Sequence, residues 1–106
     1  MSDTLQRLEQ VVRGRRGADP GTSYVASLFA KGRPRIARKL GEEAVELVVA
    51  ALAEDRAALT GEAADLLFHL MVLLAEAEVP LADVLAELDR REGTSGIAEK
   101  AARPKE

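Results

Sequence analysis

The fold is decided by two neighbouring stretches, PRIARKLGEEAVELVVAALA (34–53) and RAALTGEAADLLFHLMVLLAEAE (56–78). Apolar residues recur three and four positions apart in both, and Gly41 is the one helix breaker in the first. This spacing predicts two long helices. Asp55 stands where a helix N-cap is preferred. We therefore expect an antiparallel helical hairpin that folds about residue 54.

The rest of the chain also has helical spacing. Ser2 or Asp3 can cap a first helix that ends at the glycines after residue 13, and Thr22 or Ser23 can cap a second that runs to residue 30. Pro80 is suited to start a final helix that ends near residue 93. Because no alternating strand pattern is present, we predict an all-α bundle of four to five helices. Residues 94–106 are expected to form a polar, mobile tail.

The first helix of the hairpin is apolar on two sides. One stripe runs from Ile36 through Leu47 to Ala51, and a second contains Val45, Val49 and Leu52 in a single row. A helix with two apolar sides must be covered on both. We expect dimerisation, or a larger homo-oligomer, to complete the bundle. The alternative is that the first and last helices cover the second side within the same chain.

Composition limits the class of protein. The chain has 106 residues, 47% of them hydrophobic, which fits one domain. A net charge of -3 argues against a nucleic-acid binder. The apolar run 63–75 is interrupted by Asp65 and His69 and is shorter than the roughly 20 residues of a membrane span. The absence of cysteine excludes thiolate sites and suits a reducing cytoplasm, and the first ten residues do not resemble a signal peptide.

Two pairs of acidic residues lie inside the apolar stretches of the hairpin. Glu43 and Glu46 are three positions apart on the first helix, and Glu62 and Asp65 have the same spacing on the second. Residues three apart are neighbours on a helix surface. Since the two pairs are mirror-related about residue 54, the hairpin sets Glu43 level with Asp65 and Glu46 level with Glu62. We predict that the four carboxylates gather at one place.

Carboxylates gathered in this way favour a bound cation. Two unit charges about 5 Å apart, at an effective dielectric near 20, repel by about 3 kcal/mol. A divalent ion relieves this cost, and oxygen ligands without cysteine favour Mg²⁺ or Mn²⁺ over zinc. His69 does not follow a glutamate by three positions, which argues against a di-iron bundle. The alternative is a solvated acidic face whose partners are Arg35 and Lys39.

Basic residues precede the acidic ones on the same helix. Arg35, Lys39, Glu42 and Glu46 follow at i, i+4, i+7 and i+11 and share one face, with Lys31, Arg33 and Arg38 close by. Cations beside a divalent-ion site suit a polyphosphate ligand. The alternative for each basic residue is an ion pair within the helix, such as Lys39 with Glu43 or Arg38 with Glu42.

His69 lies one turn beyond Asp65 on the same face. Three roles are open to it: it can orient a ligand carboxylate, contact a substrate, or be a core histidine bonded to backbone. The single histidine gives no support for a Ser-His-Asp triad, and no phosphate-binding glycine loop is present.

Several stretches resemble known enzymes. Glu43-x-x-Glu46 followed by Glu62-x-x-Asp65 resembles the metal motif of the all-α nucleoside triphosphate pyrophosphatase superfamily, which includes MazG-like proteins and dimeric dUTPases. Nearly the whole chain is similar to the phosphoribosyl-ATP pyrophosphohydrolase family of histidine biosynthesis. The similar stretches are SYVASLFAKG (23–32), RKLGEEAVELVVAAL (38–52), GEAADLLFHLMVLL (61–74) and SGIAEKAARP (95–104).

This resemblance implies that residues 1–93 form a single all-α pyrophosphohydrolase domain. It implies Mg²⁺-dependent hydrolysis of phosphoribosyl-ATP to phosphoribosyl-AMP and pyrophosphate, in the cytoplasm. Glu46 is our choice for the general base that takes a proton from water. The residues implied as metal ligands are Glu43, Glu46, Glu62 and Asp65, and those implied as substrate contacts are Lys31, Arg35, Lys39, Glu42 and His69.

Two other functions remain open at this stage. One keeps the chemistry but changes the substrate, as in a MazG-like house-cleaning pyrophosphatase that acts on aberrant nucleotides. The other is a non-enzymatic helical dimerisation module whose acidic residues only make it soluble. Turnover of different nucleotides distinguishes the first from our prediction, and Mg²⁺ binding distinguishes the second.

Overall fold

The structure is a computed structural model, and it describes residues 3–53, 55–93 and 96–103. All secondary structure in this part of the chain is helical, so the all-α prediction is confirmed. The helices are α1 (Thr4–Gly14), α2 (Tyr24–Lys31), α3 (Arg33–Ala53), α4 (Arg56–Glu76), α5 (Leu81–Arg91) and α6 (Gly96–Ala102).

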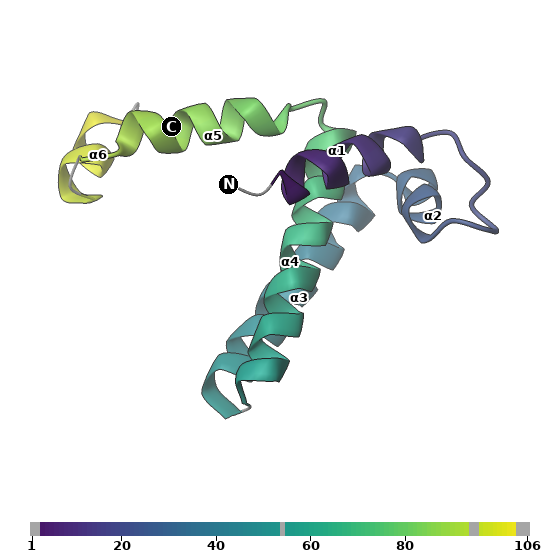
Figure 1. Cartoon of the computed structure of the whole chain (residues 1–106), viewed down its shortest axis with the longest axis horizontal. Helices are drawn as coiled ribbons and strands as arrows, with labels where there is room; N and C mark the ends of the chain where they lie inside the picture. The colour runs from purple at the N-terminus through teal and green to yellow at the C-terminus, as the bar shows by residue number, and fades with distance from the viewer. Residues whose placement is uncertain (1–2, 54, 94–95, 104–106) are drawn as a thin grey trace.

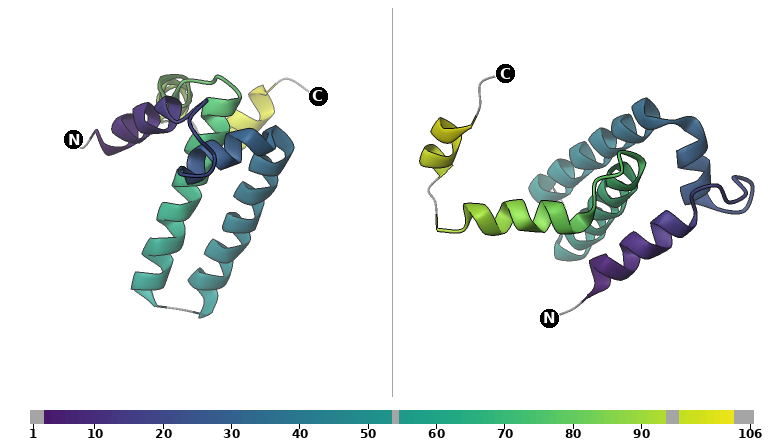
Figure 2. Two further views of the ribbon diagram at one scale, coloured as in Figure 1. Left: turned by 90° about the vertical axis from the view of Figure 1, so that its right-hand side faces the viewer. Right: turned by 90° about the horizontal axis from the view of Figure 1, so that it is seen from above.

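The predicted hairpin is the centre of the molecule. Helices α3 and α4 run antiparallel and side by side along their whole length (Figures 1 and 2). The side chain of Asp55 accepts a hydrogen bond of 2.9 Å from the backbone N–H of Ala58, as expected of an N-cap. Each acidic pair therefore lies on one arm of the hairpin, opposite the other.

The core lies at one end of the hairpin, where α1 and α2 pack against the start of α3 and the end of α4 (Figure 2). Gly32, at φ +88°, allows the abrupt turn between α2 and α3. Ser23 caps α2 by accepting a hydrogen bond from the backbone N–H of Ala26. Together these features fix α2 beside the basic start of α3. The buried core residues are Val12, Val25, Leu28, Ile36, Val72 and Ala75.

The last two helices lead away from the hairpin (Figure 1). Helix α5 is attached near α1, where the Glu9 carboxylate accepts a hydrogen bond of 2.7 Å from the backbone N–H of Leu81. Helix α6 lies inside the stretch that we expected to be a tail. Its sequence, GIAEKAA, is rich in alanine, the strongest helix former, which explains why this stretch is helical.

The part of the hairpin far from the core exposes apolar side chains. Val45, Val48, Val49 and Leu52 follow one stripe of α3 and are 50–84% exposed. Helix α5 extends away rather than lying over this stripe (Figure 1). Helix α4 has 21 residues and a mean hydropathy of 1.5 over its most apolar 18, so by length and composition it is able to cross a membrane, unlike the shorter run 63–75 considered from the sequence. The core helices of soluble proteins pass the same test.

Candidate active site

An acidic cluster forms where the two acidic pairs meet. Oxygen atoms of Glu43, Glu46 and Glu62 lie within 4.8 Å of one another. The first two residues come from α3 and the third from α4, so the hairpin brings together side chains that are far apart in sequence. Asp65 lies outside this group of three and is exposed. Its negative charge nevertheless raises the pKa of Glu43.

Glu43 is the most unusual member of the acidic cluster. The residue is 6% exposed, and its Oε2 atom has no hydrogen-bond partner among the described residues. The neighbouring Glu46 carboxyl, with which Glu43 can share a proton, and burial together raise the pKa of Glu43 from 4.5 to about 7. The charge of Asp65 acts in the same direction, whereas Lys39 lowers the pKa.

The acidic cluster fits a hard divalent cation. A buried carboxylate oxygen without a partner is costly unless a proton or a cation satisfies it. Here that oxygen lies beside two further carboxylates, which together offer the oxygen ligands that Mg²⁺ prefers. Glu43, Glu46 and Glu62 are therefore the residues that could hold such an ion.

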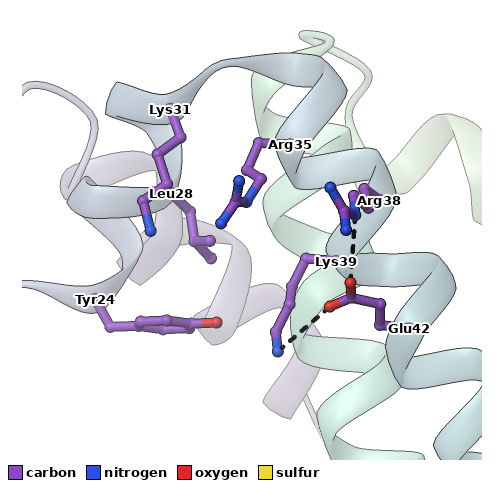
Figure 3. Close-up of a pocket in the computed structure, with 7 residues that line it drawn as sticks. All are labelled: Tyr24, Leu28, Lys31, Arg35, Arg38, Lys39 and Glu42. Carbon is purple, nitrogen blue, oxygen red and sulfur yellow. Dashed lines mark ion pairs between the residues drawn. The ribbon is translucent and has the colours of Figure 1, made fainter.

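A basic pocket of about 240 Å³ lies between α2 and α3 (Figure 3). One of its lining residues, Glu42, directly precedes Glu43 of the acidic cluster. Four predicted substrate contacts line it, namely Lys31, Arg35, Lys39 and Glu42. Its remaining lining residues are Tyr24, Leu28 and Arg38. Lys31 reaches the pocket from the end of α2, whereas Arg35 and Lys39 reach it from the first turns of α3.

The cations of this pocket differ in how they are paired. Arg38 lies 3.4 Å from the Glu42 carboxylate, as the ion-pair alternative anticipates. Lys39 lies 4.0 Å from the same carboxylate, whereas that alternative paired it with Glu43. Lys31 and Arg35 form no ion pair with any residue in the described part of the chain. These two side chains point into the space between α2 and α3 (Figure 3). They leave positive charge available for an anionic ligand.

His69 connects the two parts of the site. It is 5% exposed, and its Nδ1 atom lies 2.8 Å from the backbone oxygen of Asp65 and 3.8 Å from Oε1 of Glu43. Its Nε2 atom lies 3.0 Å from the hydroxyl of Tyr24, a residue that lines the basic pocket. The histidine thus bonds to backbone while it also stands between the pocket and the acidic cluster.

Sequence reasoning did not find Tyr24 or Leu28. Both lie on α2, and nothing in their spacing indicates that α2 packs beside the basic face of α3. The one available signal was that Tyr24 is the single tyrosine of a chain with only 3% aromatic residues. Arg38 was predicted only as a neighbour of the basic row and as an ion-pair partner of Glu42.

Comparison with known proteins identifies the family. The model of the phosphoribosyl-ATP pyrophosphohydrolase family matches residues 5–92. The chain belongs to this family. A phosphoribosyl-ATP pyrophosphatase of Rhizorhabdus wittichii is 76% identical over 105 residues, which cover 99% of both chains. Proteins of the same name from Novosphingobium aromaticivorans and Rhodobacter capsulatus are 64% and 62% identical, over 95% and 93% of this chain and 94% and 96% of theirs.

The matched region contains both parts of the site. Residues 5–92 include the hairpin with its acidic cluster, the basic pocket and His69. Family membership therefore applies to the segment that carries the chemistry, and this segment is similar to proteins named as pyrophosphatases over nearly their whole length.

Proposed function

We propose that this protein hydrolyses phosphoribosyl-ATP to phosphoribosyl-AMP and pyrophosphate in the cytoplasm, as a step of histidine biosynthesis. The observation that carries the proposal is the acidic cluster beside a pocket with free cations, in a chain of the phosphoribosyl-ATP pyrophosphohydrolase family. A triphosphate needs both features, because positive groups grip its outer oxygens while a divalent ion neutralises charge at the bond that breaks.

Magnesium is the cofactor that we propose, with Mn²⁺ as a substitute. Glu43, Glu46 and Glu62 would hold the ion, and Asp65 would add a fourth carboxylate from the next turn of α4. When bound, Mg²⁺ would polarise the phosphoryl oxygens and lower the pKa of a nearby water.

The side chains of the site have separate roles in binding the substrate and activating water. Glu46 is the exposed member of the acidic cluster, so its carboxylate can reach a water molecule and take its proton. Lys31 and Arg35 would bind the phosphates, and Lys39 would place a third positive charge between them and the acidic cluster. Glu42 keeps Arg38 and Lys39 in place through its two ion pairs. No covalent intermediate with the enzyme is needed.

The proposed function is tested by product analysis. Purified protein is incubated with Mg²⁺ and phosphoribosyl-ATP, ATP or dUTP, and the products are separated by ion-exchange chromatography. We expect phosphoribosyl-AMP and pyrophosphate from the first substrate and much slower turnover of the other two. Equal rates on all three would favour a house-cleaning pyrophosphatase instead. No turnover, together with no Mg²⁺ binding in a calorimetric titration, would favour a structural module.

Replacing Arg35 by alanine is expected to raise the KM for phosphoribosyl-ATP by about 10- to 100-fold, with a smaller effect on kcat. The reason is that a charge-assisted hydrogen bond contributes about 1.5–3 kcal/mol, and Arg35 has no competing ion pair in the described part of the chain. Arg33→Ala is the matched control, because this neighbouring arginine binds Glu76 outside the pocket. Equal KM values in the two variants would contradict a phosphate-binding role for Arg35.

We also propose that the active form is a homodimer whose interface includes the exposed apolar stripe of α3. Val45, Val48, Val49 and Leu52 leave a continuous apolar row in water, and contiguous apolar surface of this kind marks protein interfaces. A second copy of the hairpin offers the complementary apolar surface. A partner subunit would also deepen the site, which a hairpin alone leaves shallow.

Val49→Asp is expected to convert the dimer to a monomer, because it places a charge in the middle of the apolar stripe, where burial is costly. Light scattering coupled to gel filtration measures the mass directly. Val11→Asp, at a similarly exposed valine of α1, is the matched control and should remain dimeric. A wild-type protein that elutes as a monomer at all concentrations would refute the proposed interface.

A further inference from the structure

The basic pocket and the acidic cluster are joined by a chain of hydrogen bonds. The hydroxyl oxygen of Tyr24 lies 3.0 Å from Nε2 of His69, and Nδ1 of His69 lies 2.8 Å from the backbone oxygen of Asp65. His69 is buried, whereas Tyr24 is 52% exposed and lines the pocket. The chain therefore begins at a surface that a ligand can reach and ends beside the acidic cluster.

The direction of each hydrogen bond follows from the partners. A backbone carbonyl oxygen can only accept, so Nδ1 of His69 donates its proton to Asp65. In a neutral imidazole the other nitrogen then carries a lone pair, so Nε2 accepts and the Tyr24 hydroxyl donates. The single proton of the Tyr24 hydroxyl is therefore committed to His69. What this hydroxyl still offers to the pocket is an acceptor.

Acceptors are few among the side chains around it. Lys31, Arg35 and Lys39 present only donors to the pocket, and the carboxylate of Glu42, the other side-chain acceptor, already pairs with Arg38 and Lys39. The Tyr24 ring stacks on Phe68, with ring centroids 6.2 Å apart and an angle of 19° between the planes, and it meets His69 edge to face. These contacts hold the hydroxyl in position. In Figure 3 the ring lies along one side of the pocket, with Lys31, Arg35 and Lys39 around it.

The pattern of donors and acceptors predicts which part of a nucleotide each residue binds. Phosphate oxygens at neutral pH are acceptors, so they pair with the lysine and arginine side chains. A sugar hydroxyl can donate, and the ribose of a nucleoside triphosphate is attached directly to the phosphates. The Tyr24 hydroxyl is therefore complementary to this ribose and mismatched to a phosphate.

We propose that Tyr24 is a specificity-determining residue whose hydroxyl oxygen accepts a hydrogen bond from a hydroxyl of the adenosine ribose. This inference rests on the proposed function, since it takes the ligand to be a ribonucleoside triphosphate derivative. A site built to bond a substrate hydroxyl discriminates against the analogue that lacks it. Tyr24 thus favours ribonucleotides over the corresponding deoxynucleotides, while the cations of the pocket bind both.

The test compares wild type and Tyr24→Phe on three substrates. These are phosphoribosyl-ATP and its analogues with a 2′-deoxy or a 3′-deoxy adenosine ribose. We expect the wild type to lose about tenfold in kcat/KM on one of the two analogues, the size of one neutral hydrogen bond. On phosphoribosyl-ATP, Tyr24→Phe should have a kcat/KM about tenfold below that of the wild type. On the discriminated analogue, the kcat/KM of Tyr24→Phe should be no lower than its value on phosphoribosyl-ATP. The ring remains, so the stacking on Phe68 is preserved.

Two further measurements separate the competing explanations. His69→Gln keeps an acceptor near the position of Nε2, so it should retain the discrimination between hydroxyl and deoxy substrates. The inhibition constant of pyrophosphate should be the same in wild type and Tyr24→Phe. A higher constant in Tyr24→Phe would mean that Tyr24 donates to phosphate, and equal losses on all three substrates would mean that it only supports His69. Either result would overturn the inference.

The outcome is distinguishable from a failure of the proposed function. Equilibrium binding of ATP and its two deoxy analogues, measured by calorimetry with Ca²⁺ in place of Mg²⁺, gives the same comparison without turnover. Hydrolysis of phosphoribosyl-ATP without any hydroxyl discrimination would leave the proposed function standing and remove only the role of Tyr24. A wild type that neither hydrolyses nor binds these nucleotides would remove both.

Discussion

Glu46→Gln is expected to lower kcat on phosphoribosyl-ATP by at least about 100-fold while the protein remains folded. The substitution removes a carboxylate from the acidic cluster and, with it, the group that we propose as general base, a role that contributes about 10²–10⁴-fold. Glu46 is exposed, so the amide can be solvated without loss of core packing. Circular dichroism measures whether the variant is folded, and steady-state kinetics at saturating Mg²⁺ measure its kcat.

Asp65→Asn is expected to lose activity as well, because Asp65 supplies negative charge beside Glu43. Glu87→Gln is the matched control, since this acidic residue pairs with Arg90 and Arg91 on α5. It should turn over substrate at the wild-type rate. Wild-type rates in both Glu46→Gln and Asp65→Asn would show that the acidic cluster takes no part in the reaction.

The second large effect is on stability, and it depends on pH. Without metal, the free energy of unfolding is expected to fall by up to about 3 kcal/mol between pH 4.5 and pH 7.5 because of Glu43 and the Glu46 carboxyl with which it shares a proton. The pKa of Glu43 is raised from 4.5 to about 7 in the folded protein, so the folded state holds a proton that the unfolded state has lost. The contribution is complete below pH 4.5 and is lost as the pH rises through 7.

Mg²⁺ is expected to reverse this trend, because a metal ligand must be deprotonated and binding to the folded state alone raises its stability. The gain in melting temperature on adding Mg²⁺ should therefore increase from pH 5 to pH 8. Differential scanning fluorimetry with and without EDTA, at constant protein concentration, gives both curves.

Glu43→Gln is the decisive variant for this effect. It has the same shape without the titratable group, so its metal-free stability should change less with pH than that of the wild type. Glu42→Gln, at the exposed neighbour, should keep the wild-type pH dependence of stability. If wild type and Glu43→Gln gave parallel curves from pH 4.5 to pH 8, the unusual ionisation of Glu43 would be disproved.

Much of the site could be predicted from the sequence, because it depends on the spacing of residues along two helices. Helical spacing and the Asp55 cap predict the hairpin, and the mirror positions of the acidic pairs predict that α3 and α4 bring them together. The row that starts with Arg35 and Lys39 likewise predicts cations near the acidic cluster. Backbone hydrogen bonds fix the spacing within each helix, and a short connection makes the two helices antiparallel neighbours, so counting along the chain is sufficient.

The sequence did not indicate which member of an acidic pair is buried and which is exposed. Residues three apart on a helix point about 60° apart around its axis, as the pitch of 3.6 residues per turn requires. This rotation places Glu43 against α4 while Glu46 remains exposed. The spacing predicts that two side chains lie near each other, whereas the burial of each depends on what packs against it.

The sequence by itself determined the all-helical hairpin, its acidic pairs and the basic start of α3, because helical periodicity and capping are properties of neighbouring residues. Only the tertiary structure decided that α2 turns at Gly32 to close a pocket over that basic face, and that Tyr24 meets His69 across 45 positions. The physical reason is that helix docking follows from how whole apolar faces fit together, and the spacing within one helix does not contain that information.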